Sequence, residues 1–301
     1  MSGTAGEEPL RNSFRWARRW HPETEPAVNW ACSLFPAETR ARGIARGYYD
    51  YLWVLDELLR LYPSGVAGLR VLDVGCGAGV LDLALAKLGA QVTGLDRFEE
   101  YAPGSDNQMG VESEIVARLR THGVQVLRRD IATEGLPDGS AVYDLILFLA
   151  VIEHLHESPR ALLERMRELL TPGGMLAITT PNHAWIRTRL RLARGRSANH
   201  PLDEWWRTPF FGHVREYTLS ELRSMLQWAG YEVRHATIGN WLHLSTRIRN
   251  TTAGRDRWTT RFRLNSPERL AIGASLALTA LVPSLRYTML AVGRKPLAAQ
   301  G

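Results

Sequence analysis

The sequence contains very little lysine and cysteine, and no long apolar run stands near its start. Lysine occurs only at positions 87 and 295, so arginine carries almost all of the positive charge in a 301-residue chain of formal net charge +6. The two cysteines, Cys32 and Cys76, lie far apart, which argues against a disulfide framework or a Cys-x-x-Cys metal site and favours a reducing compartment. Without an apolar segment in the first 20 residues, no cleaved signal peptide is expected, and the predicted location is the cytoplasm.

Many of the arginines fall between Arg187 and Arg263, for example in WIRTRLRLARGR. We interpret this part as a solvated insert, because no RRM, KH or zinc-knuckle pattern accompanies the charge. An acidic substrate, RNA and an anionic membrane surface are the alternative interpretations. DNA is not expected as a partner, and RNA is disfavoured.

Residues 270–283, LAIGASLALTALVP, form the most hydrophobic segment of the chain. The segment is too short for a bilayer span of ~20 residues, and Pro283 and Arg286 interrupt any extension. We expect a buried or dimer-forming helix there. Peripheral attachment to a membrane surface is the second interpretation.

From residue 69 onward, strand and helix patterns alternate. Short apolar runs typical of buried strands occupy 69–75, 91–96, 124–130, 143–150 and 175–182, and helical patterns occupy 80–89, 111–123 and 158–174. Repeated β–α units with short loops predict an α/β fold, with a parallel sheet covered by helices on both faces. A capped helix at 218–230 and strands at 231–238 and 286–295 follow.

Four parts are predicted along the chain. Residues 1–65 form an N-terminal helical extension, and its helix at 47–63 covers one side of the sheet. The cofactor-binding core, a lid or substrate insert, and the completion of the sheet follow at 66–182, 183–215 and 216–301.

VLDVGCGAGV, residues 71–80, places three glycines at alternate positions directly after the first strand. A strand, a glycine-rich turn and a helix bring the backbone against a nucleotide, which the helix amides then face. The dinucleotide pattern GxGxxG would need a glycine where Val80 stands, and this disfavours an NAD-dependent dehydrogenase.

Acidic residues end the next two strands. Asp96 follows Gly75 by about 20 residues, where a carboxylate accepts hydrogen bonds from both ribose hydroxyls. Asp130 ends the third strand, placed to meet an adenine amino group, with a turn acid as the competing interpretation. Asp73, inside the first strand, is expected to organise the loop amides or to meet the amino-acid part of the ligand.

In order and spacing, these motifs resemble those of class I S-adenosylmethionine-dependent methyltransferases. The motifs are VLDVGCGAG, GLD, RRDIATEGLP, YDLILFLAVIEHL and LTPGGMLAITTPN, within residues 66–182. The resemblance implies a Rossmann-like seven-stranded sheet whose last strand is antiparallel, with S-adenosylmethionine as cofactor. The part around His213 is similar to the quinone and small-molecule O-methyltransferases of this class.

By this resemblance, one set of residues binds the cofactor. They are Asp73, Gly75, Cys76, Gly77, Gly79, Asp96, Arg97, Asp130, Ile131, Leu149 and Ala150. Within the set, Asp130 and Ile131 would surround the adenine, and Leu149 and Ala150 would line the methionine side.

The acceptor side is predicted from AVIEHLHESP, after the fourth strand. His154 is the first candidate for a general base, with Glu153 and His213 as further catalytic candidates and packing around the site as the competing interpretation. The pair also resembles a Glu-x-x-Glu-His metal pattern of RNA-end 2′-O-methyltransferases. Because Ala150 stands at its first carboxylate, no metal is expected.

The leading hypothesis is therefore a methyltransferase that acts on a small molecule, with oxygen as the favoured acceptor atom. An RNA or membrane-lipid methyltransferase is the alternative within the same class. A catalytically silent cofactor-binding module is the alternative from another class, because methyl transfer requires no nucleophile from the chain.

Overall fold

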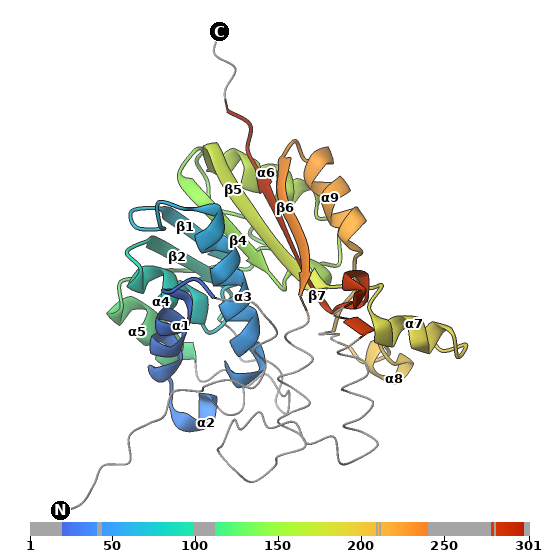
Figure 1. Ribbon diagram of the computed structural model, residues 1–301. Helices are drawn as coiled ribbons and strands as arrows, with labels where there is room; N and C mark the ends of the chain where they lie inside the picture. The colour runs from blue at the N-terminus through green and yellow to red at the C-terminus, as the bar shows by residue number, and fades with distance from the viewer. Residues whose placement is uncertain are drawn as a thin grey trace, which may run out of the picture.

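The computed structural model describes residues 20–40, 44–98, 112–208, 210, 212–239, 278–279 and 281–297. At its centre lies a seven-stranded sheet of order β3-β2-β1-β4-β5-β7-β6 (Figure 1). The strands are β1 (Arg70–Val74), β2 (Gln91–Asp96), β3 (Gln125–Arg128), β4 (Tyr143–Leu149), β5 (Leu170–Pro181), β6 (Glu232–Gly239) and β7 (Thr288–Arg294). Only β7 runs antiparallel to its neighbours, β5 and β6, which confirms the predicted α/β sheet with an antiparallel last strand.

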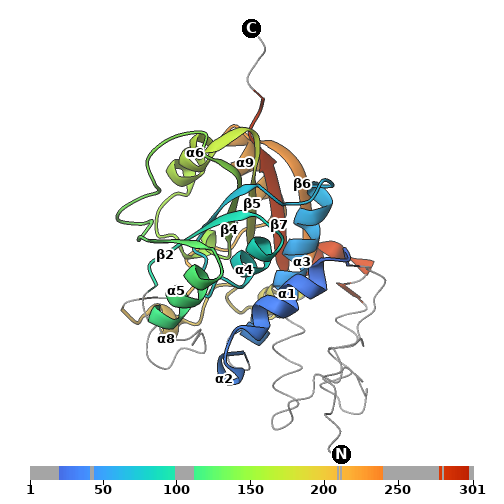
Figure 2. The ribbon, with the colours of Figure 1, turned by 90° about the vertical axis from the view of Figure 1, so that its left-hand side faces the viewer.

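Helices cover both faces of the sheet, as Figures 1 and 2 show. One face carries α1 (Thr24–Ser33), α3 (Ala45–Leu61), α4 (Val80–Lys87) and α5 (Glu112–Thr121), and the other carries α6 (Arg160–Leu169) and α9 (Leu219–Trp228). The shorter elements are α2 (Ala37–Thr39), α7 (Ile186–Leu192), α8 (Leu202–Trp205) and 3-10 turns at Ile152–His154 and Pro283–Leu285. The helix predicted at 47–63 is α3, and it covers the sheet as expected.

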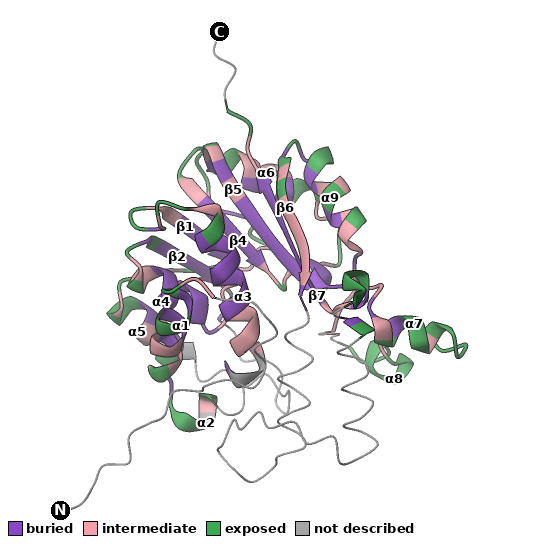
Figure 3. Cartoon of the chain, in the orientation of Figure 1, coloured by how far each residue is buried: buried purple, intermediate pink, exposed green. Residues whose placement is uncertain are grey.

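Alternate residues of the central strands enter two separate cores, and Figure 3 shows these strands buried along most of their length. In β4, Leu145 and Leu147 pack in the core on the α3 side, whereas Ile146 and Phe148 pack in the core on the α6 side. All four side chains are completely buried. The continuous apolar pattern of this strand is therefore the consequence of two covered faces.

The predicted helix at 158–174 ends earlier than its Gly-Gly pair. α6 stops at Leu169, and the next residue, Leu170, already pairs with Tyr143 of β4. Gly173 adopts a φ of 81° and donates its N–H to the Lys295 carbonyl at 3.0 Å. Hydrogen bonds to the chain just beyond β7 therefore draw the Gly-Gly pair into β5, where it forms an irregular start to the strand.

The chain leaves β6 and enters β7 at the same place, because Gly239 and Thr288 are register partners. Most of the segment between them, including residues 270–277 of the predicted apolar helix, lies outside the described residues. Among those that are described, Leu281 is 82% exposed. In the described part of the chain, no helix combines the length and the apolar character that a bilayer span requires. The division into four parts stays a prediction.

Candidate active site

The glycine loop connects β1 to α4. Gly75, Gly77 and Gly79 have φ values of 81°, 55° and 70°, in the left-handed region that residues with a Cβ rarely adopt. A Cβ on Gly75 would overlap the Val151 side chain, and a Cβ on Gly79 would overlap that of Leu119. Both conformation and space therefore require glycine at these two positions.

The end of β2 fixes this loop. The Leu95 carbonyl accepts the N–H groups of Gly75 and Cys76 at 2.7 and 3.2 Å. The carboxylate of Asp96 accepts the Gly77 N–H on Oδ2 at 2.9 Å and the Phe98 N–H on Oδ1 at 3.0 Å. Because a carboxylate offers about four lone-pair sites, Asp96 keeps acceptor capacity for two further donors.

Two acids lie side by side beneath the loop. Asp73 of β1 is 4% exposed and Asp82 of α4 is fully buried, and each carboxyl group lies close enough to the other to shift its pKa. Burial raises the pKa of Asp82 to about 7 and that of Asp73 well above its ordinary value. A Cβ on Gly94 would lie 2.6 Å from Asp82 Oδ2 and 3.0 Å from Cys76 Sγ, so the thiol lies against the same pair. Asp73 is therefore buried beneath the loop, and its role toward the cofactor stays a prediction.

The adenine side of the predicted site follows β3. Asp130 accepts the Ala132 N–H on Oδ1 at 2.8 Å, and its own N–H donates to Glu134 Oε1 at 3.0 Å. This geometry is that of a turn acid, the competing interpretation of this residue. Ile131 is half-buried and Arg97 is exposed. The roles of all three toward adenine stay predictions.

The turn after β4 lies directly against the glycine loop. Ala150 has a φ of 55°, and its N–H donates to the carbonyl and to Oγ1 of Thr179, at 3.0 and 3.1 Å. A non-glycine residue in this conformation costs about 1 kcal/mol or more and is typical of functional sites. The next residue, Val151, makes the contact with Gly75. Leu149 is half-buried at the end of the strand.

The three predicted catalytic residues converge beyond this turn. One ligand atom of each of Glu153, His154 and His213 lies within 4.8 Å of those of the other two. The Glu153 carbonyl accepts the N–H groups of Val214 and Arg215 at 2.7 and 3.2 Å, which holds the loop carrying His213 against the turn. The two imidazole rings meet edge to face, with centroids 5.0 Å apart.

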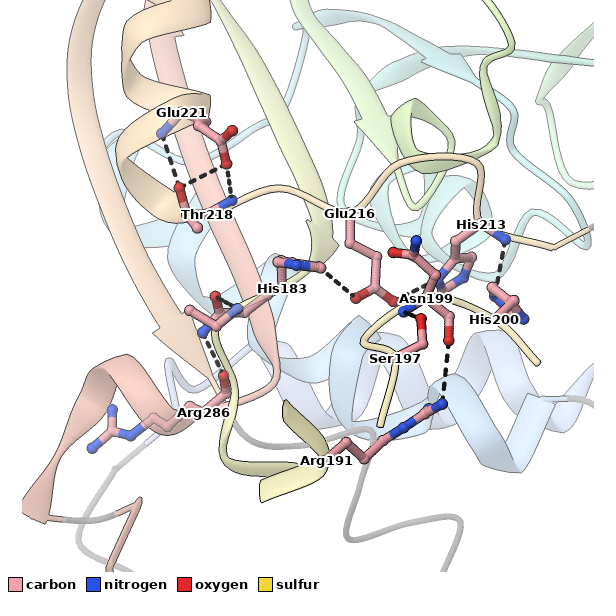
Figure 4. A network of polar contacts seen from close by, with 12 residues as sticks. His183, Arg191, Ser197, Asn199, His200, His213, Glu216, Thr218, Glu221 and Arg286 are labelled. Atoms are coloured by element: carbon pink, nitrogen blue, oxygen red, sulfur yellow. Dashed lines mark hydrogen bonds and ion pairs between the residues drawn. The ribbon is translucent and has the colours of Figure 1, made fainter. Parts of the chain in front are cut away.

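A further carboxylate organises the histidines, and the sequence pattern did not reveal it. His213 donates from Nδ1 to Glu216 Oε1 at 2.9 Å, and His183 Nδ1 lies 3.7 Å from Glu216 Oε2 (Figure 4). His200 Nε2 accepts the backbone N–H of His213 at 3.1 Å. The three-residue separation of His213 from Glu216 is the hint that the sequence gives of this network, whereas His183 and His200 come from distant positions in the segment predicted as a lid, 183–215.

Charge and burial act together in this network. Burial tends to lower the pKa of His213, but the hydrogen bond to Glu216 and the charges of Glu153 and Glu216 outweigh it and raise this pKa. Burial raises the pKa of Glu153 to about 7, and among the described residues none donates a hydrogen bond to its Oε2. Burial also tends to raise the pKa of Glu216, yet the neighbouring histidines bring it below its ordinary value. At neutral pH, Glu216 is therefore the charged partner of His213.

A family model described as a methyltransferase domain matches residues 45–236. The chain belongs to this methyltransferase family. The match confirms the class predicted from the glycine loop, and with it S-adenosylmethionine as the cofactor.

Two curated relatives of this methyltransferase are named ubiquinone biosynthesis O-methyltransferase. The one from Cereibacter sphaeroides is 36% identical over 122 residues, which are 40% of this chain and 44% of the relative. The one from Idiomarina loihiensis is 37% identical over 131 residues, 42% of this chain and 49% of the relative. The chain thus spans less than half the length of these relatives.

Among solved structures, one from Galdieria sulphuraria is provisionally named a sarcosine dimethylglycine methyltransferase. It is 16% identical, with a TM-score of 0.50, and the match covers 83% of this chain and 88% of that one. At this identity the likeness shows the fold alone, and it agrees with the sheet described above.

The residues of the loop fit S-adenosylmethionine. Gly79 is the N-cap of α4, and no side chain caps the helix, so the first amides of α4 face the loop without a side-chain acceptor at the cap. Asp96, at the neighbouring strand end, has acceptor capacity for ribose hydroxyls. The methyltransferase would therefore hold the nucleoside across the loop, with Asp96 at its sugar.

Glu153, His154 and His213 are also groups that could hold a metal ion. Since His213 commits Nδ1 to Glu216, it would coordinate through Nε2. The residue at the first position of the metal pattern, Ala150, supplies no ligand. The expectation of a metal-independent site stays a prediction.

Proposed function

We propose that this methyltransferase transfers a methyl group from S-adenosylmethionine to a hydroxyl oxygen of a small organic acceptor. One observation supports this most strongly: an imidazole oriented by a carboxylate lies just beyond the turn that contacts the glycine loop. The names of the two ubiquinone-related O-methyltransferases favour oxygen as the acceptor atom. A hydroxyl acceptor has a proton to lose, and this site offers a group to take it.

When bound, S-adenosylmethionine supplies a methyl group that its sulfonium already makes electrophilic. The glycine loop and Asp96 then have the task of fixing the donor, and the turn at 150–153 separates the donor side from the acceptor side. Holding the two reactants in line contributes several kcal/mol, about 7 or more in favourable cases. The protein needs no nucleophile of its own for this step.

We assign the proton transfer to His213. Its Nδ1–H donates to Glu216, so its Nε2 is the acceptor atom of the ring. His154 Nδ1 lies 3.1 Å from the Gly212 carbonyl, so a backbone carbonyl orients the second ring. His213 therefore has the geometry of a base with an orienting group, and His154 lies beside it.

The test is a transfer assay with a labelled methyl donor and matched acceptors. Catechols and phenols are compared with amines, thiols and carboxylic acids of similar size, and each product is identified by mass spectrometry. We expect a methyl ether from a hydroxyl acceptor. Preferential methylation of nitrogen or sulfur would contradict oxygen as the acceptor. Binding of S-adenosylhomocysteine with no transfer to any of the classes would instead favour the silent module.

A matched variant assigns the base. His213→Gln is expected to lower kcat by about 10² to 10⁴ and to leave the affinity for S-adenosylhomocysteine unchanged. His156→Gln serves as the control, because this exposed histidine follows the turn that carries Glu153 and His154 and has no described contact with Glu216. Full activity of His213→Gln would remove His213 from the proton transfer.

A further inference from the structure

Exposed apolar side chains gather on the lid. We call residues 186–208, which contain α7 and α8, the outer lid; Figure 1 shows the two helices projecting together at one side of the molecule. Among the residues that the structure describes, this segment holds much of the exposed large apolar surface. Its members are Leu190, Leu192, Leu202, Trp205 and Trp206.

α8 is the most unusual part of the outer lid. None of its residues is buried: Leu202 is 73% exposed, and the adjoining Trp206 is 82% exposed. Trp205 makes one ring contact, with Phe210 at a centroid distance of 4.7 Å, and is still 49% exposed. A helix that presents apolar side chains to water without a core face is typical of an interaction surface.

A second apolar segment lies at the base of the outer lid. The Asn182 amide donates to the carbonyls of Ser284 and Arg286 at 3.0 and 2.8 Å, and Trp185 meets Tyr287 at 4.6 Å between ring centroids. The residues just before this anchor are again exposed and apolar. They are Leu278, Leu281 and Val282.

Positive charge surrounds the apolar side chains. The outer lid contains six arginines, Arg187, Arg189, Arg191, Arg194, Arg196 and Arg207. Its two acids are already paired, Asp203 with Arg207 at 3.9 Å and Glu204 with His200 at 3.1 Å. Tryptophan and leucine among unbalanced arginines form the composition that binds the headgroup region of an anionic bilayer.

We propose that the outer lid docks on the surface of an anionic lipid bilayer. A second copy of the chain would place arginines against arginines, and an apolar protein groove would leave those charges without partners. A bilayer surface accommodates both the apolar side chains and the arginines, because tryptophan and leucine enter the interface while arginine pairs with lipid phosphates. His200 of the outer lid accepts the His213 N–H, and His183, just before the outer lid, lies beside Glu216. On the proposed function, docking would therefore bring the acceptor site to a membrane-borne, lipophilic hydroxyl compound.

Vesicle co-sedimentation of the full chain tests the surface. Phosphatidylcholine vesicles are compared with vesicles that also contain phosphatidylglycerol, at low and high salt. We expect binding to the anionic vesicles only, weaker at high salt. Leu202→Ser with Trp206→Ser, and separately Arg194→Gln with Arg196→Gln, should each weaken binding by about tenfold or more, since each arginine near an anionic surface contributes ~1 kcal/mol.

Matched controls come from the far side of the molecule. Trp228 is also 82% exposed, and it ends α9 before the chain enters β6 at Glu232. Glu232 pairs with Arg294, and Arg294 pairs with Met175 of β5. These residues lie toward the end of the strands opposite to the end that leads into Ala150 and Glu153. Trp228→Ser, and Arg120→Gln with Arg223→Gln, should leave vesicle binding unchanged.

Three outcomes overturn the docking surface. They are no binding to anionic vesicles, equal loss in the control variants, and a dimer in light scattering that the Leu202→Ser, Trp206→Ser variant abolishes. Methyl transfer to a water-soluble acceptor is measured on the same variants, and the substitutions in the outer lid should leave its rate unchanged. Vesicle binding without any methyl transfer would contradict the proposed function and leave the docking surface standing.

Discussion

His213 donates its Nδ1 hydrogen to Glu216 across 2.9 Å, and this contact sets both the orientation and the charge of the ring. Since a base must be neutral to accept a proton, activity should rise as pH increases through the pKa of His213. Glu216 raises this pKa. In Glu216→Gln, we therefore expect the acidic limb of the kcat/KM profile to move to lower pH, with a reduced kcat.

Two further variants make this measurement specific. Glu216→Asp retains the negative charge and should keep the limb near its wild-type position. Glu204→Gln removes a carboxylate that pairs with His200 rather than His213, and it should leave the limb unchanged. An acidic limb that stays fixed in Glu216→Gln would mean that His213 is not the group that titrates.

Asp96 should dominate the affinity for the nucleoside. Asp96→Ala removes both the acceptors for ribose hydroxyls and the hydrogen bond to Gly77, each of which is charge-assisted and contributes about 1.5 to 3 kcal/mol. We expect the affinity for S-adenosylhomocysteine in calorimetry to fall by about a hundredfold or more. The exposed Asp138→Ala is the control. Unchanged affinity in a well-folded Asp96→Ala protein would refute the assigned sugar contact.

The buried pair under the loop should make stability depend on pH. Burial raises the pKa of Asp82 from 3.8 to about 7, so the folded protein binds more protons than the unfolded chain between these values. The stabilisation is complete below pH 3.8 and is lost as pH rises through about 7. Asp82→Asn places an amide of nearly the same shape there, which carries no titrating proton.

We therefore expect Asp82→Asn to raise the melting temperature at pH 8 and to raise it much less at pH 5. The gain at pH 8 should be of order 1 to 3 kcal/mol, the range for relieving one poorly satisfied buried polar group. Asp138→Asn, at an exposed position, should show no such difference between the two pH values. An equal rise in the melting temperature of Asp82→Asn at pH 5 and pH 8 would exclude titration of Asp82 as its cause.

Methyl transfer should survive removal of divalent cations. His213 and Glu216 complete a base with its orienting group, and Ala150 contributes no ligand to the cluster. After dialysis against EDTA we expect the initial rate to be retained, and added magnesium, manganese or zinc should not increase it. A loss that one of these cations restores would show that Glu153, His154 and His213 act as ligands.

The sheet and the glycine loop could be predicted because their signals are local. Apolar runs mark each strand. The backbone conformation at Gly75 and Gly79 requires a residue without a Cβ, and this requirement is visible in the sequence at those positions themselves. The end of α6 could not be predicted in this way, because Gly173 bonds to Lys295, more than a hundred residues later. Only the folded sheet brings these two together.

The same difference separates the predicted site residues from the missed ones. Glu153 and His154 follow a recognisable strand, so the sequence indicates where they lie. Glu216 matters because it contacts both His213 and His183: the three-residue spacing hints only at His213, and nothing in the sequence indicates that His183 lies beside the same carboxylate. Asp82 was not predicted because it lies within VLDLALAK, where the apolar residues predict a helix but give no sign that its acid is buried.

Gly239 and Thr288 pair across β6 and β7, so the chain leaves the sheet and returns to it at neighbouring positions. Deleting residues 240–280 would leave a much shorter connection between the two strands, and shortening such a loop lowers the entropy cost of closure. Retaining residues 281–287 would preserve the contacts of Asn182 with the carbonyls of Ser284 and Arg286. The shortened chain should keep the register of β6 and β7. Comparing its activity with that of the full chain would show what residues 240–280 contribute beyond the catalysis of the core.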